Sequence, residues 1–298
     1  MEMLDEEHDG FESDDNDENL YVLGSIAGHN IVIACPPPSR IGNKPVDAVV
    51  AQMKVTFNNI RFGLIVGMGG GVPSAKADIR LGDVVVSQPH QTFGDVVQYD
   101  TKKTTRSGFE RTGSLNASQQ VLLTAVARIR ANNLQGRSNL SEHISKISRI
   151  PTFQRKNAGA DVLFEAAYDH EGGYTCDRCS ADRQEVRPPR DNAEEVVVHY
   201  GMIASGNQVI RDGRTRDKLS SKLGGILCFE MEAAGLINSF SCLVIRGICD
   251  YADSHKNKTW QPYAAATAAV YAKEVLTIIK PAGVAMTRTE EAIQSARS

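Results

Sequence analysis

The feature that most constrains the fold is a mostly apolar run at 244–249 that ends in an acidic residue, Asp250. The run reads Val-Ile-Arg-Gly-Ile-Cys, which is typical of a strand buried inside a sheet. A second segment, at 229–235, places Glu230 and Glu232 where an apolar run gives way to small, helix-favouring residues. Open α/β sheets collect such side chains in the crevice above the carboxyl ends of their strands. The two segments therefore predict an α/β fold with carboxylates at one end of its sheet.

Strand-like and helix-like segments alternate along most of the chain. The expected strands are 21–26, 30–35, 62–66, 83–87, 196–205, 225–229 and 242–249. The expected helices are 45–57, 116–129 (capped by Asn116), 212–223, 231–239 and 262–279. This alternation predicts three layers, αβα, in which helices cover both faces of a mixed, mostly parallel central sheet.

One large domain accounts for the 298 residues, and no long linker divides them. We expect residues 20–280 to form this domain. Residues 1–19 are crowded with Asp and Glu and lack periodic apolar positions, which predicts an acidic mobile arm. Residues 154–192 lose the pattern and predict a long surface insertion. Residues 281–298 predict a loosely held tail.

Charge and composition argue against several classes of partner. The formal net charge of −3 provides no basic field for a nucleic-acid backbone. No apolar run is long enough to span a bilayer, and the acidic start is unlike a signal peptide. The six cysteines are scattered and form no disulfide framework, which is typical of a reducing compartment. The composition predicts a cytoplasmic protein without membrane or nucleic-acid partners.

A glycine cluster at 67–71 adds a third feature to the two acidic segments. Together, these segments resemble the nucleoside phosphorylase and nucleosidase superfamily. More narrowly, the chain is similar to the fungal nucleoside phosphorylase-like domain that often forms the front end of larger receptor-type proteins. The resemblance runs from about Leu4 to about Lys280. It implies a purine nucleoside or nucleotide as the small-molecule partner, no cofactor, and assembly into a homo-oligomer.

Cleavage of a purine N-glycosidic bond requires a proton for the departing base. A carboxylic acid with a raised pKa can supply that proton near neutral pH. The resemblance places Asp250 in this role, with Asp253 close behind it. The alternative for Asp250 is a helix cap or a salt-bridged strand end.

The resemblance assigns ribose binding to the second acidic segment. Glu232 matches a glutamate that accepts hydrogen bonds from the 2′- and 3′-hydroxyls, where its charge also stabilises a cation-like ribosyl group. Met231 matches the residue that packs on the sugar, and Glu230 is expected as a supporting partner. The alternative for Glu232 is an exposed residue in the first turn of a helix, where the helix dipole favours it.

Further residues are expected around the substrate. The glycine cluster would let backbone pass close under the ribose, although a glycine run after a strand is as often a simple turn. Segment 205–210 resembles the end of the strand at the base pocket. There Val209 replaces the stacking aromatic of many bacterial nucleosidases, so stacking is weaker or comes from Phe229. The expected substrate-binding residues are Gly69, Gly70, Gly71, Ser205, Gly206, Asn207, Val209, Phe229, Glu230 and Met231.

The residues around the first glycine favour water over phosphate as the nucleophile. Hexameric phosphorylases have an Arg two residues before that glycine, which grips phosphate, and a Ser or Thr after it. Here these positions are Ile65 and Met68, whose side chains cannot hold phosphate. Hydrolysis of the glycosidic bond is the predicted activity. A phosphorylase and a catalytically weak nucleotide-sensing or effector module remain as alternatives.

Relatives begin with a buried strand whose glutamate activates the attacking water. Residues 3–8 resemble the segment that follows this strand, so the resemblance predicts that the strand and its carboxylate are missing here. Either the start is misassigned or the protein lacks one edge of its sheet. We expect an unpaired strand edge, and lower solubility and activity than in a form extended upstream by about thirty residues.

One group of side chains has metal-ligand character. His170, Cys176 and Cys179 supply a Cys-x-x-Cys pair and one imidazole, but a closed zinc site needs four ligands and the sequence identifies no fourth. The prediction is therefore no metal, with free thiols in a surface insertion. Segment 253–260, which contains His255 and Lys256, either covers the pocket, meets a phosphorylated substrate or forms a solvated loop.

Overall fold

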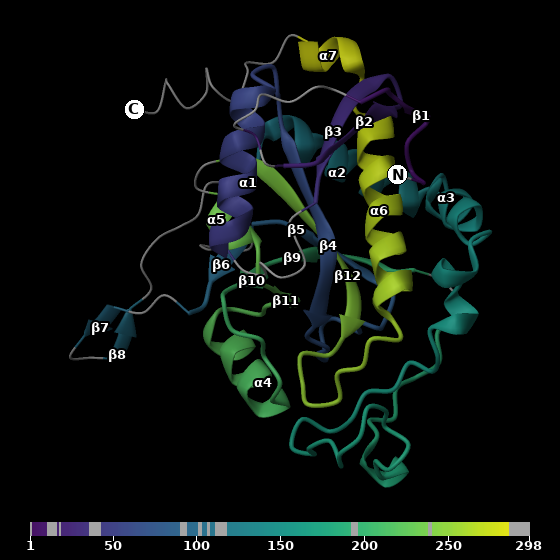
Figure 1. The fold of residues 1–298 in the computed structure, drawn as a ribbon. Coiled ribbons are helices and arrows are strands. Elements are labelled where there is room, and N and C mark those ends of the chain that lie inside the picture. Colours follow the sequence, from purple (N-terminus) through teal and green to yellow (C-terminus); the bar gives the residue numbers. More distant parts are fainter. Residues whose placement is uncertain are drawn as a thin grey trace.

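A computed structural model describes residues 2–10, 17, 19–35, 43–89, 94–100, 103–105, 108–110, 118–191, 196–237 and 240–285. Its centre is a seven-stranded sheet in the order β6-β10-β11-β4-β12-β5-β9 (Figure 1). The strands are β4 (Gly63–Gly71), β5 (Val84–Ser87), β6 (Val96–Gln98), β9 (Val198–Gly201), β10 (Ile203–Ser205), β11 (Cys228–Glu230) and β12 (Cys242–Asp250). Four neighbouring pairs run parallel, and two, β11–β4 and β12–β5, run antiparallel. The predicted mixed, mostly parallel sheet is confirmed.

Helices cover both faces of this sheet. Buried side chains of α2, α3 and α6 pack in one apolar cluster with Leu243 and Ile245 of β12. Buried side chains of α1 and α5 pack in a second cluster with Val244 and Ile248 of the same strand. The helices are α1 (Asn43–Thr56), α2 (Gln120–Leu134), α3 (Leu140–Ile147), α4 (Gly213–Lys222), α5 (Ala233–Leu236), α6 (Gln261–Ile278) and α7 (Pro281–Ala285). The predicted three-layer arrangement is confirmed.

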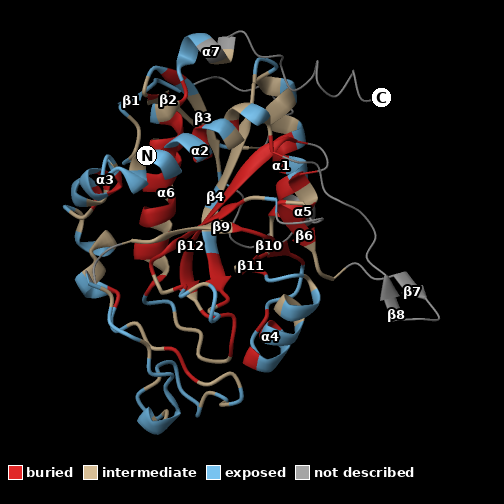
Figure 2. Ribbon diagram, turned by 180° about the vertical axis from the view of Figure 1, so that it is seen from behind, coloured by how far each residue is buried: buried red, intermediate tan, exposed pale blue. Residues whose placement is uncertain are grey.

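The central strand β12 shows why the apolar pattern forms a sheet of this kind. Successive side chains of a strand point to opposite faces, so a run that is apolar at nearly every position suits a strand covered on both sides. Every residue from Cys242 to Cys249 is buried, and only Asp250 at the end is partly exposed. Figure 2 shows this buried centre between the helical layers. Burial of each large apolar side chain contributes about 1.5 to 3 kcal/mol relative to its exposure.

The start of the chain forms a separate small sheet. Strands β2 (Tyr21–Ile26) and β3 (His29–Ala34) make the expected hairpin, whose turn places Ala27 and Gly28 at φ values of 51° and 79°. Strand β1 (Glu6–Glu7) pairs with β2, and Asp5 accepts a hydrogen bond from Lys273 of α6. This part of the expected acidic arm is therefore attached to the domain. Residues 1, 11–16 and 18 of the arm, and 286–298 of the expected tail, lie outside the described residues.

Segment 196–205 differs from its prediction as one strand. It is divided at Met202 into β9, which pairs with β5, and β10, which pairs with β6 and β11. The two parts thus occupy distant positions in the sheet order. The side chains at 201–205 are all buried, so the apolar pattern gives no sign of the change of partner.

The start of one helix and the presence of one hairpin also differ from the prediction. Helix α2 begins at Gln120 with Gln119 as its N-cap, and the expected cap, Asn116, lies outside the described residues. Two further pairing strands, β7 (Lys103–Thr105) and β8 (Gly108–Glu110), form a short hairpin that the pattern did not predict.

The expected surface insertion, 154–192, contains short turns of 3-10 helix, η2 (Arg155–Asn157) and η3 (Ala181–Arg183), and follows η1 (Pro151–Phe153). Two arginines near its end attach it to the domain. Arg187 donates to Asp161 and to the hydroxyl of Tyr251, and Arg190 forms two hydrogen bonds with the buried carboxylate of Asp83. The insertion therefore lies against the strand ends of β5 and β12.

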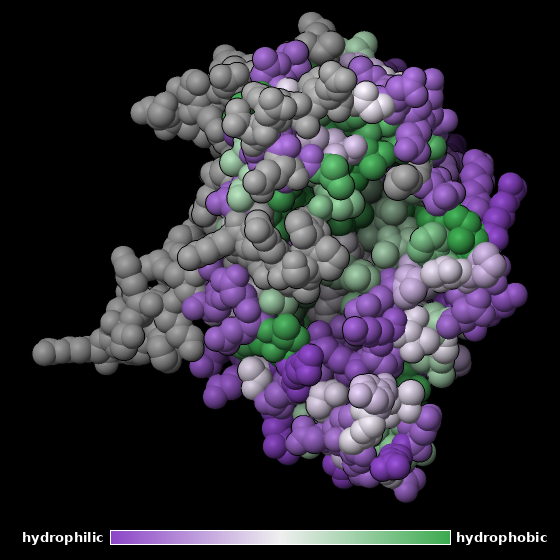
Figure 3. Space-filling model, viewed as in Figure 1, coloured by the Kyte–Doolittle hydropathy of each residue, from purple (hydrophilic) through white to green (hydrophobic). Residues whose placement is uncertain are grey.

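Strand β4 has an incompletely paired edge. It pairs with β12 from Gly63 to Gly70, whereas β11 covers its other edge only at Gly70 and Gly71. No strand in the described part of the chain pairs with that edge over 63–69. Val66 and Met68 of this stretch are 40% and 36% exposed. Figure 3, which has the viewpoint of Figure 1, shows apolar residues near the middle of this face of the molecule. Among the described residues, no helix is long and apolar enough to cross a membrane.

Candidate active site

Asp250 is the last residue of β12 and lies beside Gly70 of β4. Its carboxylate accepts a hydrogen bond of 2.9 Å from the backbone N–H of Ala252 and lies 3.1 Å from Nζ of Lys256. The bond to Ala252 closes a tight turn in which that residue has a φ of 50°, a strained value for a residue with a Cβ. The ion pair fits a proton-transfer site, and it equally fits a salt-bridged strand end. The role of Asp250 as an acid therefore stays a prediction.

The glycine cluster belongs to strand β4, which continues past the predicted strand end at residue 66. A Cβ at Gly69 would lie 2.3 Å from Sγ of Cys228, and one at Gly70 would lie 2.8 Å from Oδ1 of Asp250. A Cβ at Gly71 would lie 2.8 Å from the side chain of Ile248. Glycine is required here because β4 passes between β11 and β12 with no room for side chains. This close approach brings the two acidic segments to either side of one glycine strand.

Glu230 and Glu232 share a buried arginine that the sequence analysis did not select. Arg246 of β12 donates a hydrogen bond to the carboxylate of Glu230, and its Nη2 atom lies 3.1 Å from Oε2 of Glu232. Glu230 also accepts hydrogen bonds from the backbone N–H groups of Glu232 and Ala233, at 3.1 and 3.0 Å. The only sequence signal for Arg246 was a charge inside an otherwise apolar strand. Such a charge requires a buried partner.

The two glutamates differ in exposure. The side chain of Glu230 is fully buried, whereas that of Glu232 is 29% exposed and stands at the N-cap of α5 without capping it. Burial raises the pKa of Glu232, Arg246 opposes this shift, and the charge of Glu230 adds to it. Glu232 is thus the member of the trio that a ligand can reach. Met231, expected on the sugar, lies between the two and is partly exposed.

The expected base-pocket residues surround the end of β10. Ser205 is buried and accepts a 2.8 Å hydrogen bond from the N–H of Ala234. The N–H of Gly206 bonds to the carbonyl of Glu230 at 3.2 Å, and the N–H of Asn207 bonds to Asp100 at 2.6 Å. Val209 is 47% exposed. These contacts join segment 205–209 to the acidic segment that contains Glu230.

Tyr99 is a second residue that the sequence analysis missed. Its ring packs edge to face on Phe229 at 5.4 Å between centroids, and its hydroxyl donates to the carbonyl of Gln208. Burial, with the charges of Asp100 and Glu230, raises the pKa of Tyr99 to about 12, so the hydroxyl keeps its proton. Phe229 is itself buried. No pattern in the sequence marked Tyr99, because it follows a strand of only three residues.

The expected phosphate-binding positions hold no suitable groups in the structure either. Ile65 packs against the apolar cluster beside α1 and α5, and Met68 is a partly exposed thioether. Two cations that the structure describes in the site contact carboxylates. Arg246 contacts Glu230 and Glu232, and Lys256 contacts Asp250.

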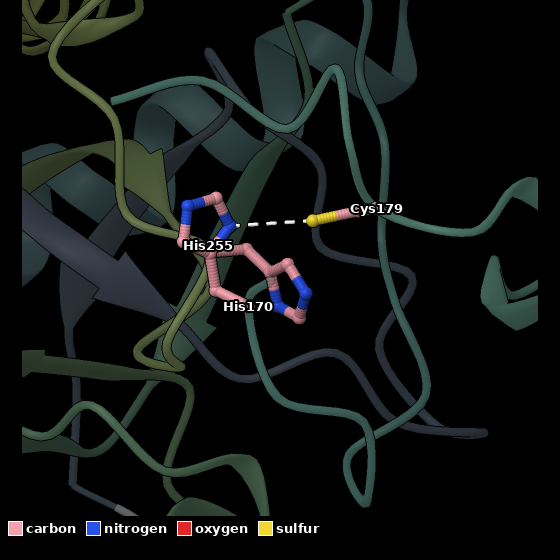
Figure 4. A group of neighbouring side chains, drawn as sticks. All are labelled: His170, Cys179 and His255. Atoms are coloured by element: carbon pink, nitrogen blue, oxygen red, sulfur yellow. Dashed lines mark hydrogen bonds between the residues drawn. The ribbon is translucent and has the colours of Figure 1, made fainter. Parts of the chain in front are cut away.

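The weak metal candidates come together near this site. His170 and Cys179 of the insertion meet His255 from the loop after β12, and their potential ligand atoms lie within 4.8 Å of one another (Figure 4). Cys176 is also close, with Sγ 3.8 Å from Nδ1 of His170.

These observations can be set beside known proteins. The sequence model of the Phosphorylase superfamily matches residues 4–281. The chain belongs to this superfamily. The predicted resemblance is confirmed by this match.

Two curated relatives are larger proteins. A nucleotide-binding leucine-rich repeat (NLR)-like protein of the fungus Hyaloscypha variabilis is 45% identical over 289 residues, which is 94% of this chain and 28% of that protein. A Death domain-containing ATP nucleosidase of Amphimedon queenslandica is 35% identical over 89 residues, 28% of this chain and 17% of that protein. This superfamily member thus spans less than a third of the length of either relative.

Solved structures of similar fold are nucleosidases and a related hydrolase. A 5′-methylthioadenosine/S-adenosylhomocysteine nucleosidase of Neisseria meningitidis, in complex with methylthio-immucillin-A, has a TM-score of 0.57 at 17% identity, over 93% of this chain and 91% of its own. A putative nucleosidase of the same kind from Borrelia burgdorferi, bound to adenine, has a TM-score of 0.59 at 15% identity, over 93% of both chains. Futalosine hydrolase of Helicobacter pylori has a TM-score of 0.54 at 18% identity, over 89% of this chain and 87% of its own. These likenesses establish the fold of the superfamily in this chain.

Proposed function

We propose that this chain hydrolyses the N-glycosidic bond of a purine nucleoside or nucleotide and releases free base and ribose or ribose phosphate. One observation carries the proposal. A carboxylate next to a cation (Asp250 and Lys256) and a partly exposed carboxylate on a buried arginine (Glu232 and Arg246) flank the glycine strand β4. The names of the relatives, which include an ATP nucleosidase and adenosine-type nucleosidases, support the same chemistry.

The reaction places a separate demand on each carboxylate. Asp250 gives a proton to the base nitrogen as the bond to C1′ breaks, so that the base leaves neutral. Asp250 then recovers a proton from solvent, while the ammonium of Lys256, 3.1 Å away, holds the carboxylate in place. Glu232 accepts hydrogen bonds from the ribose hydroxyls, and its charge stabilises the cation-like ribosyl group. A water oxygen then bonds to C1′ and loses a proton to solvent.

Base release measured by chromatography tests the proposal. Purified chain is incubated with adenosine, AMP, ATP or inosine, with and without inorganic phosphate. We expect free base in the absence of phosphate, no acceleration by phosphate, and ribose or ribose phosphate carrying no new ester at C1′. Ribose 1-phosphate as the main product from a nucleoside would instead identify a phosphorylase.

A second candidate is a module that binds a nucleotide with little or no turnover. The incompletely paired edge of β4 favours it, as does the coverage of only 28% of the NLR-like relative. Calorimetric titration with the same four ligands separates the two functions. Saturable binding without base release would establish the module and overturn the hydrolase. As a proposal, such a domain would act in the cytoplasm as the effector part of a larger protein.

A further inference from the structure

The cluster between the insertion and the loop after β12 contains four side chains of metal-ligand type, not three. His170, Cys176 and Cys179 come from the insertion, and His255 comes from the loop that follows Asp250 (Figure 4). Nδ1 of His170 lies 3.3 Å from Sγ of Cys179 and 3.8 Å from Sγ of Cys176. The fourth group was absent from the sequence argument because 76 residues separate Cys179 from His255.

These separations fit one tetrahedral ion. With Zn–S of about 2.3 Å and Zn–N of about 2.05 Å, a sulfur and a nitrogen ligand of tetrahedral zinc lie about 3.5 Å apart. The two observed sulfur–nitrogen distances lie on either side of this value. The potential ligand atoms of His170, Cys179 and His255 also lie within 4.8 Å of one another. One ion can therefore contact His170, Cys179 and His255, and Cys176, whose Sγ lies 3.8 Å from Nδ1 of His170, would complete the set after a side-chain rotation.

His255 supplies an independent observation. Its side chain is only 6% exposed, and neither ring nitrogen has a hydrogen-bond partner. An unpartnered buried imidazole is costly, because it loses water without gaining a new bond. The ring stacks on Phe164 at 4.1 Å between centroids and is thereby held in place. Its Nδ1 lies 3.7 Å from the carboxylate of Asp253, and metal-bound histidines commonly direct their second nitrogen at such a group.

The local backbone has the form that a pair of cysteine ligands requires. The N–H of Cys179 bonds to the carbonyl of Cys176 at 3.0 Å, so both thiols project from one tight turn. Gly172 and Gly173, with φ of 74° and 87°, reverse the chain between His170 and this turn. The N–H of His170 bonds to the hydroxyl of Ser254 at 2.9 Å, which fixes the insertion against the loop that contains His255.

We propose that His170, Cys176, Cys179 and His255 bind one structural zinc ion. Two thiolates and two imidazoles form a closed set of four ligands and suit zinc among common divalent cations. The thiolates neutralise the charge of the ion. With four protein ligands no position remains for water, so the ion ties the insertion to the loop and takes no part in the reaction. The competing structure is a Cys176–Cys179 disulfide or a free thiol pair.

The metal content of the purified chain tests the site directly. We expect about one zinc per chain by elemental analysis, retained on dialysis against a weak chelator. Replacement of zinc by Co²⁺ should give the visible bands of four-coordinate cobalt and a thiolate-to-cobalt band in the near ultraviolet. Cys176→Ser, Cys179→Ser and His255→Asn should each weaken zinc binding by at least about tenfold. Cys35→Ser, at an exposed cysteine outside the cluster, is the matched control and should bind zinc normally.

Measurements on the unmodified chain test the zinc site even if a variant fails to fold. Absence of zinc together with absence of cobalt bands in the unmodified protein would overturn it. So would intact zinc binding in all three ligand variants. A Cys176–Cys179 disulfide, found by mass spectrometry in protein purified under zinc-replete, reducing conditions, would establish the competing structure.

The ion has a consequence for the candidate active site, and this consequence rests on the proposed function. His255 precedes Lys256, the cation beside Asp250, so zinc would fix the position of that contact. Removal of zinc should lower base release more than it lowers ligand affinity, and added zinc should restore it. Zinc binding without base release would refute the proposed function alone. If zinc removal leaves base release unchanged, zinc does not fix the position of Lys256. The metal analysis would still test whether the four residues bind zinc.

Discussion

At the scale of single residues, the proposed mechanism depends on the proton of Asp250. We predict that Asp250→Asn lowers the rate of base release by about 10²- to 10⁴-fold, because the amide has no acidic proton to donate. Ligand affinity should stay within about tenfold, since the shape is kept and the loss belongs to the chemical step. Single-turnover rates and calorimetric affinities measure the two quantities. Normal turnover by this variant would remove Asp250 from the mechanism.

Glu232 should behave differently, because in the proposed mechanism it binds the ribose in both the ground state and the transition state. Glu232→Gln replaces a charged acceptor by a neutral one, so we expect ribose binding and rate to fall together, each by about tenfold. Steady-state kinetics with a nucleoside and binding of the free base separate the effects. The free base has no ribose, so its affinity should be unchanged. Loss of base binding would mean that Glu232 acts on pocket structure instead.

The shared arginine makes the pH dependence of the site testable. Burial and the nearby Glu230 raise the pKa of Glu232 above its ordinary value of 4.5, against the effect of Arg246. If ionised Glu232 binds ribose, kcat/KM falls on the acidic side at a pH above that value. Glu230→Gln removes the like charge and should move this acidic limb to lower pH, whatever its effect on the maximum. Glu142→Gln, on the surface of α3, is the control. If the acidic limb lies at the same pH in the unmodified, Glu230→Gln and Glu142→Gln proteins, the assignment is contradicted.

At the level of residues, the sequence selects candidate site residues but does not show their partners. Asp250, Glu230 and Glu232 stand out as acids at the ends of apolar runs, so a motif finds them. Arg246 and Tyr99 find their partners only when the fold brings β12 and the segment after β6 near β11, each across one intervening strand. The roles of all five residues await the experiments above.

At the scale of elements, the connection of the insertion to the sheet is the feature with a clear stability consequence. Asp83 is buried, which raises its pKa, but hydrogen bonds from Arg190 and His199 outweigh burial and hold the pKa below its ordinary value. A carboxyl whose pKa is lower in the folded state stabilises the fold above its unfolded pKa of about 3.9. This contribution is lost as the pH falls through the folded value.

We predict that Asp83→Asn lowers the free energy of unfolding by about 3 kcal/mol near pH 7, because Arg190 and His199 lose a buried partner. The difference from the unmodified chain should shrink as the pH falls below 4, where Asp83 itself becomes protonated. Denaturant unfolding at several pH values measures it. Glu142→Gln, which breaks the exposed pair with Lys146, should have no measurable effect. A constant difference at every pH would contradict this account.

Element boundaries were predictable where local composition indicates the element and failed where partners change. The β2–β3 hairpin, α1, α4, α6 and β12 lie close to their predicted bounds, because the residues of each segment indicate its type. The division at Met202 and the glycine strand β4 do not. The first depends on which strands β9 and β10 pair with, and the second on a space between two neighbours that admits only glycine. Neither cause is local in sequence.

For the whole molecule, the three-layer class followed from alternating strands and helices, whereas the strand order could not be read from the sequence. That order produces the incompletely paired edge of β4 in the described part of the chain. Unpaired N–H and C=O groups beside exposed apolar side chains form a template for pairing with another strand. We therefore expect this edge to determine whether the chain forms a homo-oligomer and how soluble it is.

We predict that this chain associates with itself as its concentration rises, and that Val66→Lys on β4 reduces the association. A lysine on a strand edge opposes edge-to-edge pairing, because pairing would bury its charge. Sedimentation velocity over a concentration series gives the mass distribution of both proteins. Val55→Lys is the matched control, since Val55 is 83% exposed on α1 and far along the chain from the site residues. If Val55→Lys dissociates the protein as well as Val66→Lys does, association depends on general surface charge. If the unmodified chain is monomeric at every concentration, the edge of β4 is protected and the expected self-association is wrong.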